Sequence, residues 1–170
     1  LKISLVGKTN AGKSTLLNNF IGETISITNK KINTTEDLIT GIVNINDIQI
    51  IIYDTPGINF IKDLKEVNIK LKRNLWEGLN QCDIILYVID SFTVNYKYLF
   101  NNLNKLQELN KKICIVFNKN DLVNKDIILQ HLDNITKKYK IDAFFNISAK
   151  KKNGFNNFKK YFLKNSFPSD

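Results

Sequence analysis

The segment that most restricts the fold of this chain runs from Gly7 to Ser14 and reads GKTNAGKS. It matches the pattern G-x-x-x-x-G-K-[ST] and directly follows the strand-like run KISLVG (2–7), while a helical pattern begins near Lys13 and ends by Gly22. A loop between a strand and a helix points successive backbone N–H groups inward, where they can bind phosphate oxygens. The segment therefore predicts a phosphate-binding loop in an α/β fold.

Strand-like apolar runs alternate with helical patterns along the rest of the chain. Predicted strands at 38–46 and 48–54 are separated by Asp47 and are typical of an antiparallel hairpin. Three nearly continuous apolar runs, at 83–90, 112–118 and 143–148, are typical of strands covered by helices on both faces. The helical patterns lie at 64–80, 96–110, 125–139 and 154–164. The expected fold class is a three-layer α/β domain with a mostly parallel six-stranded sheet and one antiparallel edge strand.

The residue types in the predicted phosphate-binding loop are suited to binding a triphosphate. Gly7 and Gly12 allow tight backbone turns. Lys13 places a positive charge on the β- and γ-phosphates, and Ser14 offers a hydroxyl to Mg²⁺. The candidate phosphate-binding residues are Gly7, Lys8, Thr9, Asn10, Ala11, Gly12, Lys13, Ser14 and Thr15.

A second motif, DTPGI, follows the strand-like run IIIY. The carboxylate of Asp54 can hold the same Mg²⁺ through water. Gly57 lacks a Cβ atom, so its N–H can approach the γ-phosphate closely. The side chain of Ile58 forms no hydrogen bonds. It therefore cannot position a water molecule for attack on the γ-phosphate. The candidate residues of this motif are Asp54, Thr55, Pro56, Gly57 and Ile58.

Two further motifs point to a guanine base. NKND ends the strand-like run ICIVF, and SAK follows the last predicted strand. Asp121 can accept both the N1–H and the amino group of guanine, whereas adenine presents a lone pair there. Asn118 can tie this loop to the phosphate loop, the stem of Lys119 can cover the base plane, and a backbone N–H of SAK can reach the guanine oxygen. The candidate base-binding residues are Asn118, Lys119, Asn120, Asp121, Ser148, Ala149 and Lys150. The alternative for NKND is a polar loop that caps a helix at Asp121.

In this order the motifs resemble those of the translation-factor-related GTPases, and among these most closely the Era-type bacterial GTPases. The resemblance rests on the asparagine of GKTNAGKST, on the segment ETISITNKKINTTEDLITGIV, and on the long lysine-containing segment after DTPGI. It covers essentially all 170 residues and implies a Ras-like P-loop GTPase domain. Asn33 stands where sister families carry glycine, which favours the Era type. Glu36 and Asp37 stand where a basic residue usually follows the two threonines, so no role of that basic residue is transferred.

The resemblance implies an enzyme that cleaves GTP to GDP and phosphate, depends on Mg²⁺ and is slow without an activator. It implies catalytic roles for Lys13, Thr35 and Gly57, and Mg²⁺ ligation by Ser14, Thr35 and Asp54, with Thr34 as the alternative to Thr35. The implied switch residues are Asn33, Thr34, Thr35, Glu36 and Asp37. In some relatives the asparagine that matches Asn10 helps to hold K⁺, which makes K⁺ a candidate cofactor.

The resemblance also implies a G domain at 1–165, a linker that starts at 166–170, and an RNA-binding KH domain beyond the chain. The expected partners are GTP, GDP, 16S rRNA and the small ribosomal subunit during its assembly, and not DNA. The expected location is the cytoplasm, with peripheral association at the inner face of the cell membrane. The alternatives are a tandem ribosome-assembly GTPase, a tRNA-modification GTPase, an ATPase, or a nucleotide-gated RNA-binding module with negligible intrinsic hydrolysis.

Composition adds little to this assignment. The net charge of +9 comes almost entirely from lysine, since Arg73 is the only arginine, and fits either an RNA-binding surface or an AT-rich genome. Cys82 and Cys114 lack metal-ligand or redox spacing and are expected to be reduced thiols. His131, the sole histidine, has no neighbouring motif that indicates a metal.

Overall fold

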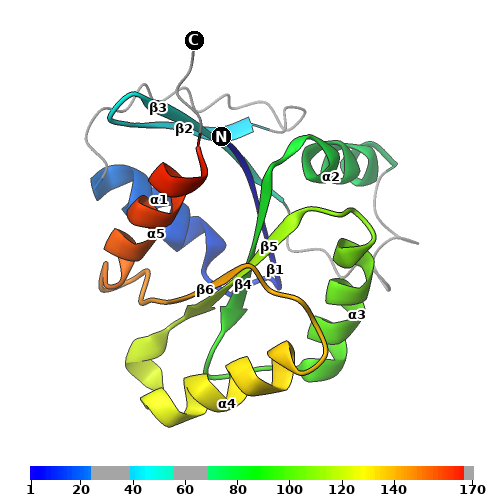
Figure 1. The fold of residues 1–170 in the computed structure, drawn as a ribbon, viewed down its shortest axis with the longest axis vertical. Helices are drawn as coiled ribbons and strands as arrows, with labels where there is room; N and C mark the ends of the chain where they lie inside the picture. Colours follow the sequence, from blue (N-terminus) through cyan, green and yellow to red (C-terminus); the bar gives the residue numbers. More distant parts are fainter. Residues whose placement is uncertain (24–38, 56–68, 167–170) are drawn as a thin grey trace.

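The computed structural model describes residues 1–23, 39–55 and 69–166 (Figure 1). The predicted switch residues Asn33–Asp37 and the positions Pro56, Gly57 and Ile58 lie outside the described residues, as do 167–170. The strands are β1 (Lys2–Gly7), β2 (Ile39–Ile45), β3 (Ile48–Asp54), β4 (Ile84–Asp90), β5 (Lys112–Asn118) and β6 (Ala143–Asn146). The helices are α1 (Lys13–Glu23), α2 (Ile69–Gln81), α3 (Tyr96–Gln107), α4 (Lys125–Thr136) and α5 (Phe155–Asn165), and a 3₁₀ turn spans Asn120–Leu122.

The six strands form one sheet in the order β2-β3-β1-β4-β5-β6. Only β2 runs antiparallel, pairing with β3 at the edge, so the expected fold class is confirmed. Leu5 lies opposite Asp54, Gly7 opposite Val88, and Asp90 opposite Asn118. The register therefore brings the carboxyl ends of β1, β3, β4 and β5 to one edge, which is where ligands bind in open α/β sheets.

Helices cover both faces of the sheet, as the continuous apolar strands predict (Figure 1). Alternate residues of β4 supply the two cores: Ile84, Leu86 and Val88 pack with α1 and α5. The intervening residues of the strand pack with α2, α3 and α4. This two-residue alternation follows from the pleat of a strand. The helix α1, which is the next element after β1, packs on the same face as α5.

The aromatic stripe of α5 is confirmed as part of the core. Phe155, Phe158 and Phe162 are buried, and their rings meet the ring of Phe20 edge-on at 5.7–6.0 Å. Tyr161 packs against the same cluster with partial exposure. The stripe holds α5 on α1, the helix that begins at the phosphate loop.

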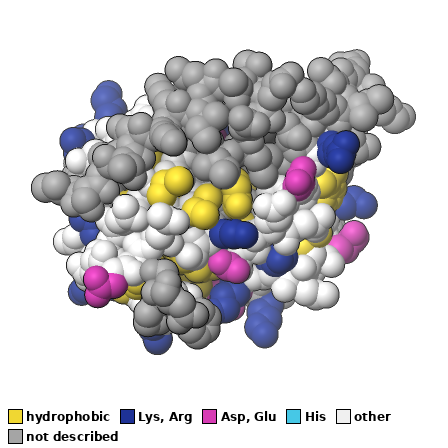
Figure 2. All heavy atoms as spheres, turned by 90° about the horizontal axis from the view of Figure 1, so that it is seen from above, with side chains coloured by type: hydrophobic (Ala, Val, Ile, Leu, Met, Phe, Trp, Pro, Cys, Tyr) yellow, Lys and Arg dark blue, Asp and Glu magenta, His cyan; other side chains and the backbone are white. Residues whose placement is uncertain are grey.

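The described surface carries mixed charge. On the face shown in Figure 2, basic and acidic side chains are interspersed and a few hydrophobic side chains lie between them. Lysines therefore do not gather into a single basic patch among the described side chains of this face. Both cysteines are free and buried. Of the helices described, none has the length and apolar character required to cross a membrane.

Candidate nucleotide-binding site

The phosphate loop connects β1 to α1 and is crowded by neighbouring backbone and side chains. A Cβ atom on Gly7 would lie 2.4 Å from the carbonyl oxygen of Val88, because β1 and β4 pair at this point. A Cβ atom on Gly12, whose φ is +95°, would lie 2.2 Å from Nδ2 of Asn118. Both glycines are therefore required by close approach as well as by backbone turning. Only the turning was foreseen from the sequence.

A cavity of about 520 Å³ opens beside this loop. Lys13, Ser14 and Thr15 line it from the first turn of α1, and Thr9, Asn10 and Gly12 line it from the loop. Asp54 and Thr55 reach the cavity from the end of β3, and Lys119 reaches it from the loop after β5. The free N–H groups at the start of α1 add a partial positive charge, as an anion site requires. The structure thus brings residues of the phosphate loop, of DTPGI and of NKND to one cavity.

Lys13 and Asp54 are held in an environment that disfavours their charges. Lys13 is buried, and its Nζ donates to the carbonyls of Gly7 at 2.7 Å and Lys8 at 3.3 Å. Burial lowers the pKa of Lys13, and the negative charge of Asp54 offsets part of that shift. Burial likewise raises the pKa of the Asp54 carboxyl, and the charge of Lys13 opposes it. A phosphate anion near Lys13 and a cation near Asp54 would each restore the charged form.

These residues fit a Mg²⁺ ion that is shared with phosphate. The hydroxyl of Ser14 and the carboxylate of Asp54 line the same cavity, and both are the oxygen ligands that Mg²⁺ prefers. Within residues 1–23, 39–55 and 69–166, no group of three or more His, Cys, Asp or Glu could hold a metal ion. Among the described residues, Ser14 and Asp54 are therefore the candidate ligands of a magnesium ion, while the expected ligand Thr35 lies outside them.

Thr55 has a structural role in joining β3 to β1 that the sequence did not indicate. Its hydroxyl donates to the carbonyl of Leu5 at 2.5 Å, and its N–H donates to the same oxygen at 3.2 Å. The side chain is buried, so this threonine fixes the end of β3 against β1. Thr55 therefore holds Asp54 in position while also lining the cavity.

Asn118 ties together the phosphate loop and both segments predicted to bind the base. Its side-chain Nδ2 donates to the carbonyl of Ala11 at 2.8 Å, and its Oδ1 accepts from the N–H of Ala149 at 2.9 Å. The residue is only 2% exposed. The predicted tie between the NKND loop and the phosphate loop is confirmed, and the same amide also orients the SAK segment.

Asp121 and Ser148 form a second link between the base segments. The hydroxyl of Ser148 donates to the Asp121 carboxylate and lowers its pKa; desolvation opposes the shift, and the charges of Lys151 and Lys150 add to it. Nζ of Lys151 lies 3.9 Å from Asp121 Oδ2. The carboxylate is thus oriented and kept ionised, as an acceptor of two guanine N–H groups must be. The sequence indicated only a backbone N–H for SAK, although its serine is the type of residue that could have suggested this bond.

Lys119 adopts a left-handed backbone, with φ of 61°. Its Nζ donates to the carbonyl of Asn10 at 3.0 Å and pairs with Asp90 Oδ2 at 2.6 Å. Asn10 is itself left-handed, with φ of 69°, a conformation that asparagine tolerates better than most residues. Sequence reasoning missed Asp90. The available signal was an acidic residue that ends an apolar strand at the same edge as Asp54.

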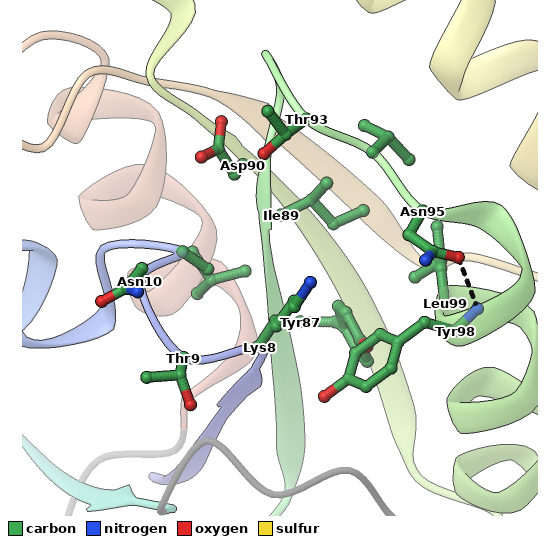
Figure 3. Close-up of a pocket in the computed structure, with 13 residues that line it drawn as sticks. Lys8, Thr9, Asn10, Tyr87, Ile89, Asp90, Thr93, Asn95, Tyr98 and Leu99 are labelled. Atoms are coloured by element: carbon green, nitrogen blue, oxygen red, sulfur yellow. Dashed lines mark hydrogen bonds between the residues drawn. The ribbon is translucent and has the colours of Figure 1, made fainter.

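A second cavity, of about 230 Å³, lies on the far side of Thr9 and Asn10, between the phosphate loop and α3 (Figure 3). Lys8 and Tyr98 both line this cavity, with Nζ of Lys8 5.9 Å from the centroid of the Tyr98 ring. The predicted phosphate residues Lys8 and Ala11 therefore line this second cavity, whereas Thr9 and Asn10 line both cavities.

The contacts of the His131 side chain hold neighbouring elements of the fold together. Its Nδ1 lies 2.5 Å from the hydroxyl of Tyr96, and its Nε2 lies 3.1 Å from the carbonyl of Ser91. Its ring stacks on Phe117. The two ring nitrogens thus link α4 to the start of α3 and to the loop after β4.

A comparison with protein families decides the assignment. The family profile described as "50S ribosome-binding GTPase" matches residues 2–119. The chain belongs to this GTPase family. Among curated relatives, GTPase Era of Rickettsia bellii (strain OSU 85-389) is 42% identical over 127 residues, which are 75% of this chain and 42% of the relative.

Solved structures agree that the chain is an Era-like G domain. A variant of Era from Aquifex aeolicus bound to GDP·AlF₄⁻ superimposes with a TM-score of 0.78 at 33% identity, covering 99% of this chain and 57% of that one. Era in complex with MgGDPNP and nucleotides 1506–1542 of 16S ribosomal RNA gives a TM-score of 0.76 at 32% identity, with the same coverage. The chain thus spans about half the length of the Era proteins that it matches.

Proposed function

We propose that this chain binds GTP and GDP with Mg²⁺ and hydrolyses GTP, as the G domain of an Era-type protein. The observation that carries the proposal is the direct bonding of the phosphate loop to the base loop. Asn118 and Lys119 donate to the consecutive carbonyls of Ala11 and Asn10. A nucleotide that occupies the cavity would therefore meet a phosphate cradle and a guanine reader built as one unit.

The described residues can supply charge stabilisation for phosphoryl transfer. Lys13 and the N–H groups of the loop and of α1 face the cavity where the β- and γ-phosphates would lie, and can stabilise the negative charge that develops there. Mg²⁺, held by Ser14 and Asp54, would supply further charge neutralisation. The roles proposed for Thr35 and Gly57 rest on the family resemblance, because both lie outside the described residues.

Single-turnover cleavage of radiolabelled GTP by this chain tests the enzyme proposal. We expect slow phosphate release that requires Mg²⁺, exceeds that of Lys13→Ala, and is absent with ATP. A rate equal to that of Lys13→Ala, with and without ribosomal RNA, would contradict the proposal. Preferential cleavage of ATP would instead support the ATPase alternative.

A nucleotide-gated RNA-binding module is the second candidate function. The observation that favours it is Ile58, since its side chain cannot position water where many GTPases have glutamine. If cleavage matches that of Lys13→Ala but RNA binding differs between GTP and GDP, this second function replaces the first.

We further propose that the full-length protein binds 16S rRNA during assembly of the small ribosomal subunit, mainly through a KH domain beyond Asp170. Support comes from the solved Era relative that holds nucleotides 1506–1542 of 16S rRNA. The family description names the 50S subunit instead, so the test must compare both subunits. We expect the full-length protein to bind an RNA that matches nucleotides 1506–1542 of 16S rRNA more tightly than 23S fragments. The reverse preference would favour a large-subunit factor.

Potassium is the proposed activating ion, through Asn10. The left-handed backbone of Asn10 is held by Lys119, so its exposed side chain starts from a fixed position beside the phosphate cavity. We expect GTP cleavage to be several-fold faster in KCl than in NaCl at equal ionic strength, and Asn10→Ala to remove the difference. Equal rates in the two salts would exclude this role.

A further inference from the structure

An ion pair joins the end of β4 to the base-reading loop. Asp90 Oδ2 lies 2.6 Å from Nζ of Lys119, and the two side chains are 18% and 33% exposed. The same ammonium donates to the carbonyl of Asn10 at 3.0 Å. One cation therefore connects three chain segments: the end of β4, the phosphate loop and the NKND loop.

Asp90 is itself firmly placed. Its Oδ1 accepts the N–H of Phe92 at 3.0 Å, and its backbone pairs with Asn118 across β4 and β5. Partial burial alone would raise the pKa of Asp90, but hydrogen bonds from Lys119 and Phe92 and the charge of Lys119 hold the pKa below its usual value. Asp90 is thus an ionised carboxylate anchored by the sheet, with one oxygen directed at Lys119. It lies at the rim of the second cavity beside Thr93 (Figure 3).

The anchor determines where the Lys119 side chain lies. Lysine has a flexible four-carbon stem that loses considerable rotamer freedom when it is fixed. With its ammonium held between Asp90 and Asn10, the stem of Lys119 must span the distance from the NKND loop to the phosphate loop. Lys119 also lines the phosphate cavity, so Asp90 balances a positive charge next to Lys13.

We propose that Asp90 is a positioning residue that holds Lys119 against the phosphate loop and thereby slows the release of guanine nucleotide. The inference rests on the proposed binding of GTP and GDP. In the bound state the fixed stem would form one wall of the base site, and its fixed ammonium would keep the phosphate and base loops together. Release of nucleotide would require these loops to separate, which breaks the bridge.

The substitution Asp90→Asn tests this role with little change in shape. Asparagine retains an oxygen that can accept from Phe92, but it removes the negative charge and can present an N–H₂ group to Lys119. We expect the dissociation rate of a fluorescent GDP analogue, measured by stopped flow, to rise about tenfold, which is typical of a lost charge-assisted hydrogen bond. The unfolding midpoint without nucleotide should change little.

Two comparisons separate positioning from a general structural effect. In a Lys119→Met background the stem remains but the ammonium is gone, so adding Asp90→Asn should not accelerate release further. The matched control is Asp83→Asn at the other end of the β4 segment, where the carboxylate accepts from the N–H of Lys2 at 2.8 Å. That change should leave GDP release unaltered.

The outcomes are distinct. An unchanged release rate in Asp90→Asn, or equal acceleration with and without the Lys119 ammonium, would overturn the positioning role while the wild-type chain still bound GDP. Failure of the wild-type chain to bind GDP would instead contradict the proposed function itself.

Discussion

The contact between Gly12 and Asn118 shows how one hydrogen atom in place of a side chain determines the geometry of the site. The amide of Asn118 reaches the Ala11 carbonyl only because position 12 has no Cβ atom. Glycine is thus required at this position by the base-reading loop as much as by the phosphate. The two motifs constrain each other although Ala11 and Asn118 lie 107 positions apart along the chain.

Gly12→Ala is predicted to damage both loops. The new methyl would overlap Nδ2 of Asn118, and alanine is strained at a φ of +95°. The amide must move and leave the buried carbonyl of Ala11 without its donor. We expect a loss of about 1–3 kcal/mol in the free energy of unfolding and at least about tenfold weaker GDP binding. Urea denaturation and fluorescent GDP titration would measure the two effects.

Gly22→Ala is the matched control. It makes the same chemical change within α1, but apart from the two chain neighbours and the backbone of that helix no described heavy atom lies within 4 Å of the added Cβ. Because alanine favours helix over glycine, we expect a gain of about 0.5 kcal/mol in the free energy of unfolding and no change in GDP binding. Equal losses in both variants would show that the crowding at Asn118 is not the cause.

Sequence reasoning identified motif residues more readily than their neighbours. It predicted that Asn118 would join the two loops, because strand ends meet at one edge of a parallel sheet. It did not predict Asp90, the hydroxyl of Ser148 or the bond of Thr55 to β1. Each of these depends on side-chain directions and registers that are set by packing, which no spacing along the chain encodes.

At the scale of elements, the first residues of helices and strands were predicted better than their last residues. The predicted helix at 125–139 starts correctly but ends at Thr136, and in the turn that follows the N–H groups of Lys138 and Tyr139 share the carbonyl of Ile135. This turn lets Tyr139 pack against the ring of Phe100. The predicted strand at 143–148 ends at Asn146, and the Ile147 carbonyl instead accepts from Asn120 in the base loop. Tertiary contacts thus shorten both elements in ways that local patterns do not show.

The start of α4 offers a prediction about a single cap. Asn124 precedes the helix in an extended conformation, and its Oδ1 accepts from the N–H of Ile127 at 3.1 Å. Asn124→Ala removes that acceptor and should lower the free energy of unfolding by about 1 kcal/mol in urea denaturation. Asn124→Asp keeps the acceptor and should restore the stability. A loss that persists in the aspartate variant would mean that the cap is not responsible.

Across the whole molecule, two buried thiols make the fold sensitive to alkali. Burial raises the pKa of Cys114 from 9.0 to about 11, although a hydrogen bond with Tyr161 lowers it in part. A raised folded pKa means that the stabilisation is complete below pH 9 and is lost as the pH rises from about 9 to about 11. The pKa of Cys82 is also raised by burial. Urea denaturation at pH 8, 9 and 10 should show falling stability.

Cys114→Ala isolates the contribution of that thiol to the alkaline loss. The variant should be less stable at pH 8 because a small cavity replaces the sulfur. Its further decline between pH 8 and 10 should be smaller than in the wild type, since one titrating group is gone. An unchanged decline would assign the alkaline sensitivity to Cys82 and the tyrosines instead.

Ligand binding should report on the site through the stability of the whole chain. A ligand that binds only the folded state at about 100 times its Kd adds about 2.7 kcal/mol to the free energy of unfolding. For a chain of this size that corresponds to a rise of about 5–10 °C in Tm. We expect this shift with GDP and Mg²⁺ but not with ADP, because Asp121 is the residue proposed to select the base. Asp121→Asn should lose the shift with GDP and gain one with xanthosine diphosphate, since an amide can donate to the xanthine oxygen.

The matched control is Asp126→Asn, which changes an exposed carboxylate in the first turn of α4 and should keep the response to GDP. A shift with GDP that survives in Asp121→Asn would place base recognition elsewhere in the chain.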